Sequence, residues 1–270
     1  MGASLYDFTV LSSDEVAEGI CRMRIECDAA SVLSSGQFLN LAVPGDGSHI
    51  LRIPLSFSAT DAERGIIEIV FAVVGEGTAR LSAMGPGSAS TLLAPLGHGW
   101  RIPADASRVL LVAGGIGLPP IVAAARACAD EGVGYDAIVG ARTAAAHVSY
   151  LLDELRSYIP GASESPLCHP RVIVTTDDGS MGIHGLVTHA MEDLLAENRY
   201  DAVLACGPNP MLAGVAALAE RVQAPCQVSL ERMMGCGFGA CSCCNVGLRS
   251  GGYALCCTDG PVFDAREVAW

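Results

Sequence analysis

The sequence carries little positive charge. Its 270 residues include 16 lysine and arginine side chains against 29 aspartate and glutamate side chains, for a formal net charge of −13 at pH 7. Nucleic acids and anionic membrane surfaces attract proteins that display clusters of Lys and Arg. The charge balance therefore argues against both as partners.

Long apolar runs and a leader segment are also missing. The longest apolar run, 109–125, is short for a bilayer and is broken by three glycines, Pro119 and Pro120, so we expect no membrane span. The first fifteen residues lack a basic segment followed by an apolar stretch, and we expect no signal peptide. Twelve cysteines in such a chain indicate a reducing, cytoplasmic location, where clustered cysteines bind metal more often than they form disulfides.

Aromatic residues are scarce, at 5%, whereas 51% of all residues are hydrophobic. A core can therefore be buried, but Ala and Gly must fill much of it. The length favours two or three domains. Changes in pattern predict the divisions 1–104, 105–225 and 226–270.

The first hundred residues predict β structure. Apolar-rich or alternating stretches are separated by glycine and proline breaks, as in a small barrel or sandwich. The expected strands are Tyr6–Val10, Ile20–Glu26, Gln37–Leu41 and Gly65–Val74.

From Arg108 onward, apolar strands alternate with helical stretches, which predicts a doubly wound parallel sheet. The expected strands are Val109–Ala113, Tyr135–Val139, Arg171–Thr175, Asp201–Ala205 and a last short one, Gln227–Leu230. The expected helices are a stretch ending at Asp130, then Ala144–Ser157, Gly185–Glu197 and Pro210–Val222.

Six of the twelve cysteines lie in a glycine-rich tail that has almost no apolar periodicity. Cys236, Cys241 and Cys244 are spaced C-x4-C-x2-C, and twelve residues separate Cys244 from Cys257. This is the ligand spacing of a plant-type [2Fe–2S] cluster. A zinc site is the alternative, although zinc sites favour C-x2-C pairs.

Two of these ligands have a neighbouring cysteine as competitor. Cys244 is preferred over Cys243 because it gives the x2 spacing. Cys257 is preferred over Cys256 because it directly precedes the segment TDGPVF.

Two further motifs follow predicted strands. Gly114, Gly115 and Gly117 lie where a strand turns into a helix, and glycines there let a pyrophosphate approach the helix N-terminus. Cys206 and Gly207 follow the fourth strand of the α/β region, where a nicotinamide would lie. The alternatives are a tight turn without ligand and a small buried cysteine.

In the β region, Arg52 and Ser56 at a strand end suit a flavin diphosphate, and the turn through Gly77 and Thr78 suits a phosphate. Each signal is weak by itself. The six histidines form no pair with metal-ligand spacing, and the sequence supports no catalytic acid, base or nucleophile, so we assign no catalytic residue.

Together these stretches resemble the electron-transfer subunit of class 1B dihydroorotate dehydrogenase, a family of the ferredoxin–NADP reductase superfamily. The matching segments occur in the family's order: RIPLS, VVGEGT, APLGHGW, VAGGIGLPP, TTDDGSMGIHG, ACGPNPM and the tail from ERMMGCGFGACSCCNV to CTDGPVFD. The resemblance implies an N-terminal FAD-binding β-barrel, a central NAD domain and a small C-terminal [2Fe–2S] lobe.

The resemblance also assigns residues. The flavin-contacting stretches map to Ile53, Pro54, Leu55 and Ser56, to Val70, Phe71 and Ala72, and to Gly77 and Thr78. Ile53 stands where the family has an arginine, and Arg52 lies one position earlier. The family's cluster ligands map to Cys236, Cys241, Cys244 and Cys257.

The implied function is that of an NAD-linked oxidoreductase subunit in pyrimidine biosynthesis. It passes electrons between NAD and an FMN-containing dihydroorotate dehydrogenase subunit, in a heterotetramer with two copies of each chain. Three alternatives remain: a similar subunit of an electron-bifurcating NAD(P)H–ferredoxin complex, a stand-alone oxygenase reductase, and a zinc-stabilised nucleotide-binding module.

Overall fold

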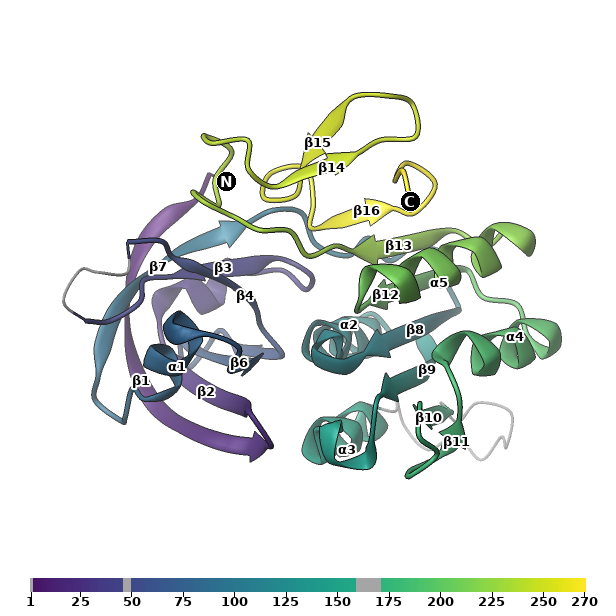
Figure 1. The fold of residues 1–270 in the computed structure, drawn as a ribbon, viewed down its shortest axis with the longest axis horizontal. Coiled ribbons are helices and arrows are strands. Elements are labelled where there is room, and N and C mark those ends of the chain that lie inside the picture. Colours follow the sequence, from purple (N-terminus) through teal and green to yellow (C-terminus); the bar gives the residue numbers. More distant parts are fainter. Residues whose placement is uncertain (1, 46–49, 159–170) are drawn as a thin grey trace. The chain divides into compact units, whose positions relative to one another are not determined.

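The computed structural model describes residues 2–45, 50–158 and 171–270 (Figure 1). By its internal contacts the chain separates into two compact units, which we call unit 1 (Met1–Gly99 with Glu231–Val262) and unit 2 (Trp100–Leu230 with Phe263–Trp270). The segments 1–104, 105–225 and 226–270 predicted from the sequence divide the chain by the cofactor that each would bind. This division remains a prediction.

Unit 1 is built on a seven-stranded antiparallel sheet in the order β4-β3-β7-β1-β2-β6-β5 (Figure 1). Because β4 also contacts β6, the sheet curves back on itself as a half-barrel. Its strands are β1 (Ser4–Ala17), β2 (Ile20–Glu26), β3 (Phe38–Leu41), β4 (Ile53–Ser56), β5 (Ala59–Asp61), β6 (Ile66–Ala72) and β7 (Ala89–Leu96). A 3-10 turn, Asp28–Ser31, follows β2, and a short helix, α1 (Glu76–Ser82), follows β6.

The half-barrel core comes from alternation along the strands. On β2, Met23 and Ile25 are fully buried while the residues between them are more exposed, which is the period-2 pattern of a sheet with one covered face. The predicted antiparallel β part is therefore confirmed. From the sequence, β4 was expected only as a strand end at Arg52 and Ser56, and neither β5, with its three residues, nor β7, which contains Pro95, was predicted.

Unit 2 has a second seven-stranded sheet in the order β11-β10-β9-β8-β12-β13-β16, and the pairs from β11 to β13 are parallel. Its strands are β8 (Arg108–Gly114), β9 (Gly134–Ala141), β10 (Val172–Thr176), β11 (Ile183–His184), β12 (Ala202–Cys206), β13 (Cys226–Ser229) and β16 (Val262–Asp264). The helices are α2 (Leu118–Asp130), α3 (Ser149–Ser157), α4 (Val187–Glu197) and α5 (Asn209–Arg221), with 3-10 turns at Gly115–Gly117 and Ala144–Ala146.

Helices cover both faces of this sheet. α2 packs with α3 on one face and α4 packs with α5 on the other (Figure 1). The central strand β8 is buried from Val109 to Gly114, as expected for a parallel strand covered on both sides. The predicted doubly wound sheet is confirmed.

The strand order locates the ligand edge of unit 2. From β8 the chain moves outward through β9, β10 and β11, and then returns to the other side of β8 as β12. The order therefore reverses between β8 and β12, and ligands of open α/β sheets bind beyond the carboxyl ends of strands at such a point.

The tail contributes to both units. β14 (Asn245–Gly247) and β15 (Tyr253–Leu255) form a hairpin in unit 1, and β16 adds an edge strand to the sheet of unit 2. None of the helices in the described ranges has the length and apolar character that a bilayer crossing needs.

Candidate redox and nucleotide sites

The first two predicted cluster ligands lie in one tight loop. The amide of Cys236 donates to Sγ of Cys241 at 3.4 Å, and the amide of Ala240 donates to Sγ of Cys236 at 3.3 Å. Gly237 and Gly239 adopt φ values of +80° and +89°, which other residues rarely accept. The loop thus folds its backbone amides toward its sulfurs.

The other two predicted ligands form a second pair. The amide of Cys257 donates to Sγ of Cys244 at 3.4 Å, and the two thiols are hydrogen-bonded to each other. The thiol of Cys257 also accepts from the amide of Gly239. The second pair is therefore joined to the loop of the first.

The two pairs differ in electrostatics. Burial opposes ionisation of Cys236, but the amide of Phe238, the thiol of Cys241 and the amides of the loop together lower its pKa to about 7. Burial, and then the Cys244 thiol, raise the pKa of Cys257 to about 12. Thiolates are the form that binds iron, so cluster binding must displace a proton that the Cys257 thiol holds strongly.

This arrangement fits a binuclear centre. Among the described residues, no three His, Cys, Asp or Glu side chains converge as ligands of one metal ion. A [2Fe–2S] cluster instead takes four thiolates shared between two irons. Two thiol pairs with amides directed at the sulfurs suit that requirement.

The competing cysteines lie differently. Cys243 is exposed, whereas the preferred Cys244 is buried. Cys256 and Cys257 are both buried, and burial followed by Cys244 raises the pKa of each to about 12. Cys257 also interacts with Gly239 and Cys236 of the first loop.

In unit 1 the predicted flavin strand β4 pairs with β3, with Ile53 opposite Leu41 and Pro54 opposite Asn40. The four residues of β4, including Leu55 and Ser56, are half-buried, so a ligand can reach them. The guanidinium of Arg52 donates to the carbonyl and hydroxyl oxygens of Thr91, each at 2.9 Å, and to the carbonyl of Asn40 at 3.4 Å. Arg52 therefore binds the sheet itself, in addition to any role with phosphate.

The other predicted flavin residues are mostly inside the unit. Val70 and Phe71 are buried in β6, and Ala72 is half-buried at its end. Gly77 and Thr78 are buried in α1. The Thr78 hydroxyl accepts from the amides of Val74 and Gly75 and donates to the carbonyl of Gly75, so this side chain fixes the turn.

Asn40 is a site residue that the sequence reading did not select. Its side chain is 1% exposed, and its Oδ1 is one of two buried side-chain atoms in the described residues that lack a hydrogen-bond partner, together with Ser35 Oγ. An unpaired buried acceptor beside β4 suits a ligand that brings an N–H group, as an isoalloxazine does. The available signal was a polar residue within the apolar run FLNL.

In unit 2 the two predicted nucleotide motifs come together at the edge where the strand order reverses. A Cβ on Gly117 would lie 2.2 Å from the carbonyl oxygen of Cys206, and one on Gly207 would lie 3.1 Å from Cα of Gly114. Gly115, with φ +54° and open space around it, is exposed at the turn. Pro119 and Pro120 then open α2.

Cys206 lies where a nicotinamide contact was predicted. It is half-buried at the carboxyl end of β12, in register with Ala113 of β8. Gly115 is exposed at the neighbouring turn, and a helix N-terminus preceded by such a turn is where a pyrophosphate binds.

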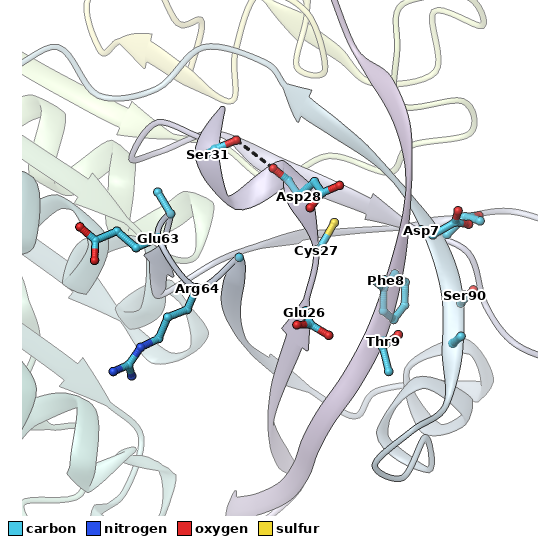
Figure 2. Close-up of a pocket in the computed structure, with 14 residues that line it drawn as sticks. Asp7, Phe8, Thr9, Glu26, Cys27, Asp28, Ser31, Glu63, Arg64 and Ser90 are labelled. Carbon is cyan, nitrogen blue, oxygen red and sulfur yellow. Dashed lines mark hydrogen bonds between the residues drawn. The ribbon is translucent and has the colours of Figure 1, made fainter.

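A separate concavity of about 800 Å³ opens on the half-barrel. Figure 2 shows that its lining includes residues of β1, of the end of β2 and the turn after it, and of β7, and its charged groups are Asp7, Glu26, Asp28, Glu63 and Arg64. This lining is mainly acidic and would repel a phosphate. It contains none of the predicted site residues, and we do not assign it to a cofactor.

The sequence was compared with known families. Residues 231–269 match the iron–sulfur cluster binding domain of dihydroorotate dehydrogenase B, and residues 111–217 match the oxidoreductase NAD-binding domain. These ranges contain the four paired cysteines and most of the doubly wound sheet. The expected iron–sulfur cluster and NAD are thereby confirmed as cofactors.

Individual relatives agree with this result. The chain is 41% identical over 239 residues to the dihydroorotate dehydrogenase B (NAD(+)) electron transfer subunit of Geobacillus kaustophilus, covering 86% of each chain. It is 31% identical to the corresponding subunit of Desulforamulus reducens, covering 99% of each chain.

A solved structure agrees in fold. The structure of an NADH-dependent reduced ferredoxin–NADP oxidoreductase, described in connection with flavin-based electron bifurcation, superposes with a TM-score of 0.80 at 30% identity. The match covers 97% of this chain and 89% of that one. With relatives above 30% identity over nearly its whole length, the chain belongs to the family of dihydroorotate dehydrogenase B electron transfer subunits.

Proposed function

We propose that this chain carries electrons between NAD(H) and a separate FMN-containing dihydroorotate dehydrogenase subunit, through FAD and a [2Fe–2S] cluster. The cluster is held by Cys236, Cys241, Cys244 and Cys257. The observation that carries the proposal is the arrangement of these four thiols in two pairs, with backbone amides that donate to the sulfurs of Cys236, Cys241 and Cys244. The complex contains two copies of each subunit and works in the cytoplasm in pyrimidine biosynthesis.

The protein's own residues position the cofactors. The glycine turn after β8 gives a dinucleotide pyrophosphate access to backbone amides, and Cys206 lies beside the nicotinamide. The half-buried strand β4 and the turn through Gly77 and Thr78 hold the FAD. When bound, the flavin exchanges electron pairs with NAD(H) and the cluster carries single electrons.

The test of cofactor content uses the purified chain. We expect flavin absorption bands, broad visible absorption from the cluster, about two irons per chain and an EPR signal after reduction. A colourless protein with stoichiometric zinc would instead identify a zinc-stabilised nucleotide-binding module and contradict the proposal.

The partner is tested by co-expression with an FMN-containing dihydroorotate dehydrogenase subunit. We expect the two chains to co-purify and to reduce NAD when dihydroorotate is supplied. The isolated chain should lack this activity but should still transfer electrons from NADH to an artificial acceptor. Co-purification without NAD reduction would contradict the assigned partner.

A second candidate is a subunit of an electron-bifurcating NAD(P)H–ferredoxin complex. The observation that favours it is the superposition, at TM-score 0.80, on a structure described in those terms. The two candidates separate by electron acceptor, because a bifurcating complex reduces ferredoxin with NAD(P)H and needs no dihydroorotate. Ferredoxin reduction by the complex in the absence of dihydroorotate would favour this candidate.

A further inference from the structure

One side chain of the half-barrel reaches the cluster loop. Nδ2 of Asn40, on β3, donates to the carbonyl oxygen of Cys236 at 3.0 Å. Gly237 makes room for this contact, because a Cβ there would lie 2.3 Å from Nδ2. Glycine is therefore needed at this position for two reasons: the backbone has a φ of +80°, and the Asn40 amide approaches too closely for a side chain.

The same residue is built into the strand pair that the proposed function assigns to the flavin. Asn40 lies opposite Pro54 of β4, and its backbone carbonyl accepts from the guanidinium of Arg52. Asn40 therefore touches the first cluster ligand with its side chain and the flavin strand with its backbone.

The orientation of this amide is fixed by chemistry. A flipped amide would bring Oδ1 against the carbonyl oxygen of Cys236, and two acceptors repel. In the orientation observed, Oδ1 remains buried without a partner among the described residues. Burying an acceptor that no protein group satisfies costs stability, so an apolar residue would suit this buried strand better unless the side chain serves the cluster loop through Nδ2 or the flavin through Oδ1.

We propose that Asn40 is a positioning residue that sets the conformation of the cluster loop and thereby the reduction potential of the cluster. This inference rests on the proposed function, since it requires that Cys236 and Cys241 bind a cluster.

Cys236 connects the Asn40 side chain to the hydrogen bonds that affect the reduction potential of the cluster. The carbonyl of Cys236 is held by Asn40, and the amide of Cys236 donates to Sγ of Cys241. Hydrogen bonds to the sulfurs stabilise the reduced, more negative cluster and raise its potential. When the carbonyl is released, the Cys236 amide and the Ala240 amide that donates to its thiol lose their alignment.

Loss of the Asn40 contact should lower the reduction potential of the cluster. Greater solvent access would also raise the potential, but Cys241 and Ala240 are already exposed, so little exposure remains to be gained. Weaker N–H···S hydrogen bonds therefore dominate, and the cluster becomes harder to reduce.

The experiment compares the midpoint potential of the cluster in wild-type chain, Asn40→Leu and Gly237→Ala. Leucine has the same branching of heavy atoms without a donor, and the alanine methyl displaces the amide from the opposite side. In each variant the equilibrium constant for one-electron reduction of the cluster should fall about tenfold, which lowers the midpoint potential by about 59 mV. Because Gly237→Ala also strains a loop residue with φ +80°, Asn40→Leu is the variant that tests the contact alone.

Ser90→Ala is the matched control. It removes the hydrogen bond from Ser90 Oγ to the carbonyl of Ala42, the residue after β3, at 3.2 Å. The control should keep the wild-type potential. A folded Asn40 variant that holds less iron than this control also supports the inference, because the loop has lost its geometry.

The outcomes separate the two hypotheses. Variants with lower thermal stability but unchanged iron content and an unchanged or raised potential overturn the role of Asn40 and leave the proposed function intact. A wild-type chain that holds no cluster overturns the proposed function, and the role of Asn40 with it.

Discussion

Gly117 in the turn after β8 packs directly on the backbone of Cys206 at the end of β12. A Cβ at Gly117 would lie 2.2 Å from the carbonyl oxygen of Cys206 and 2.8 Å from the amide nitrogen of Gly207. Both neighbours are backbone atoms, which cannot rotate away as a side chain can. The close contact between the two nucleotide motifs therefore depends on the missing side chain.

Gly117→Ala should damage this edge of the sheet. We expect the free energy of unfolding to fall by about 1–3 kcal/mol, the usual cost of overpacking, and NADH binding to weaken. Urea unfolding and calorimetric titration with NADH measure the two effects. Gly85→Ala, where a Cβ meets nothing within 4 Å, is the control and should change neither. Equal NADH affinity in both variants would contradict the role of the turn.

Adjacent cysteines allow a direct test of the proposed ligands. Cys257→Ser and Cys244→Ser should abolish the cluster, because each removes one member of the buried thiol pair. Cys256→Ser and Cys243→Ser should keep it. Iron and sulfide content and the EPR signal of the reduced protein report the outcome. Loss of the cluster in Cys256→Ser with retention in Cys257→Ser would refute the choice between these neighbours.

Asp136 lies near the amino end of β9, and we expect its carboxylate to contribute strongly to the stability of unit 2. Its carboxylate is 0% exposed, pairs with Arg108 at 2.8 Å, and accepts from the hydroxyl of Tyr200 and the amide of Arg171. Asp136→Ala leaves these donors without their acceptor. We expect a loss of about 3–5 kcal/mol in the free energy of unfolding.

The control for this prediction is Asp153→Ala, which removes an exposed pair with Arg156. Such pairs contribute about 0–1 kcal/mol. Urea unfolding curves recorded at one pH give both values. Similar losses in the two variants would show that burial of the Asp136 carboxylate does not set its contribution.

The sequence predicted the parallel sheet well because continuous apolar strands such as β8 are distinctive when both faces are buried. It also placed both nucleotide motifs directly after strands of that sheet. The turn after β8 and the turn after β12 are nearly a hundred residues apart, yet both follow strands of one sheet, whose carboxyl ends share an edge.

Other features depend on tertiary contacts that carry no local signal. Strand β5 has three residues, and its place in the sheet comes from pairing with β6. The edge strand β16 lies in the tail but joins the distant β13. The contact of Asn40 with Cys236 spans 196 positions, so no spacing rule could reveal it.

A final prediction concerns pH. His147 is buried, and its ring nitrogen lies 3.3 Å from the carbonyl oxygen of Thr175. Burial lowers the pKa of His147, and the hydrogen bond to Thr175 offsets only part of this effect. Between the lowered pKa and the unfolded value of about 6.5, the unfolded chain binds more protons than the folded one. Stability should therefore fall as the pH drops below about 6.5.

The variant His147→Gln removes this titration and should flatten the dependence of stability on pH. Urea midpoints measured from about pH 8 to about pH 5 test it, a window in which histidine is the side chain whose ordinary pKa lies in range. His184→Gln, at an exposed position, is the control and should retain the wild-type profile. Parallel profiles for wild type and His147→Gln would contradict the prediction, because the proton uptake that destabilises the chain would then occur at other groups.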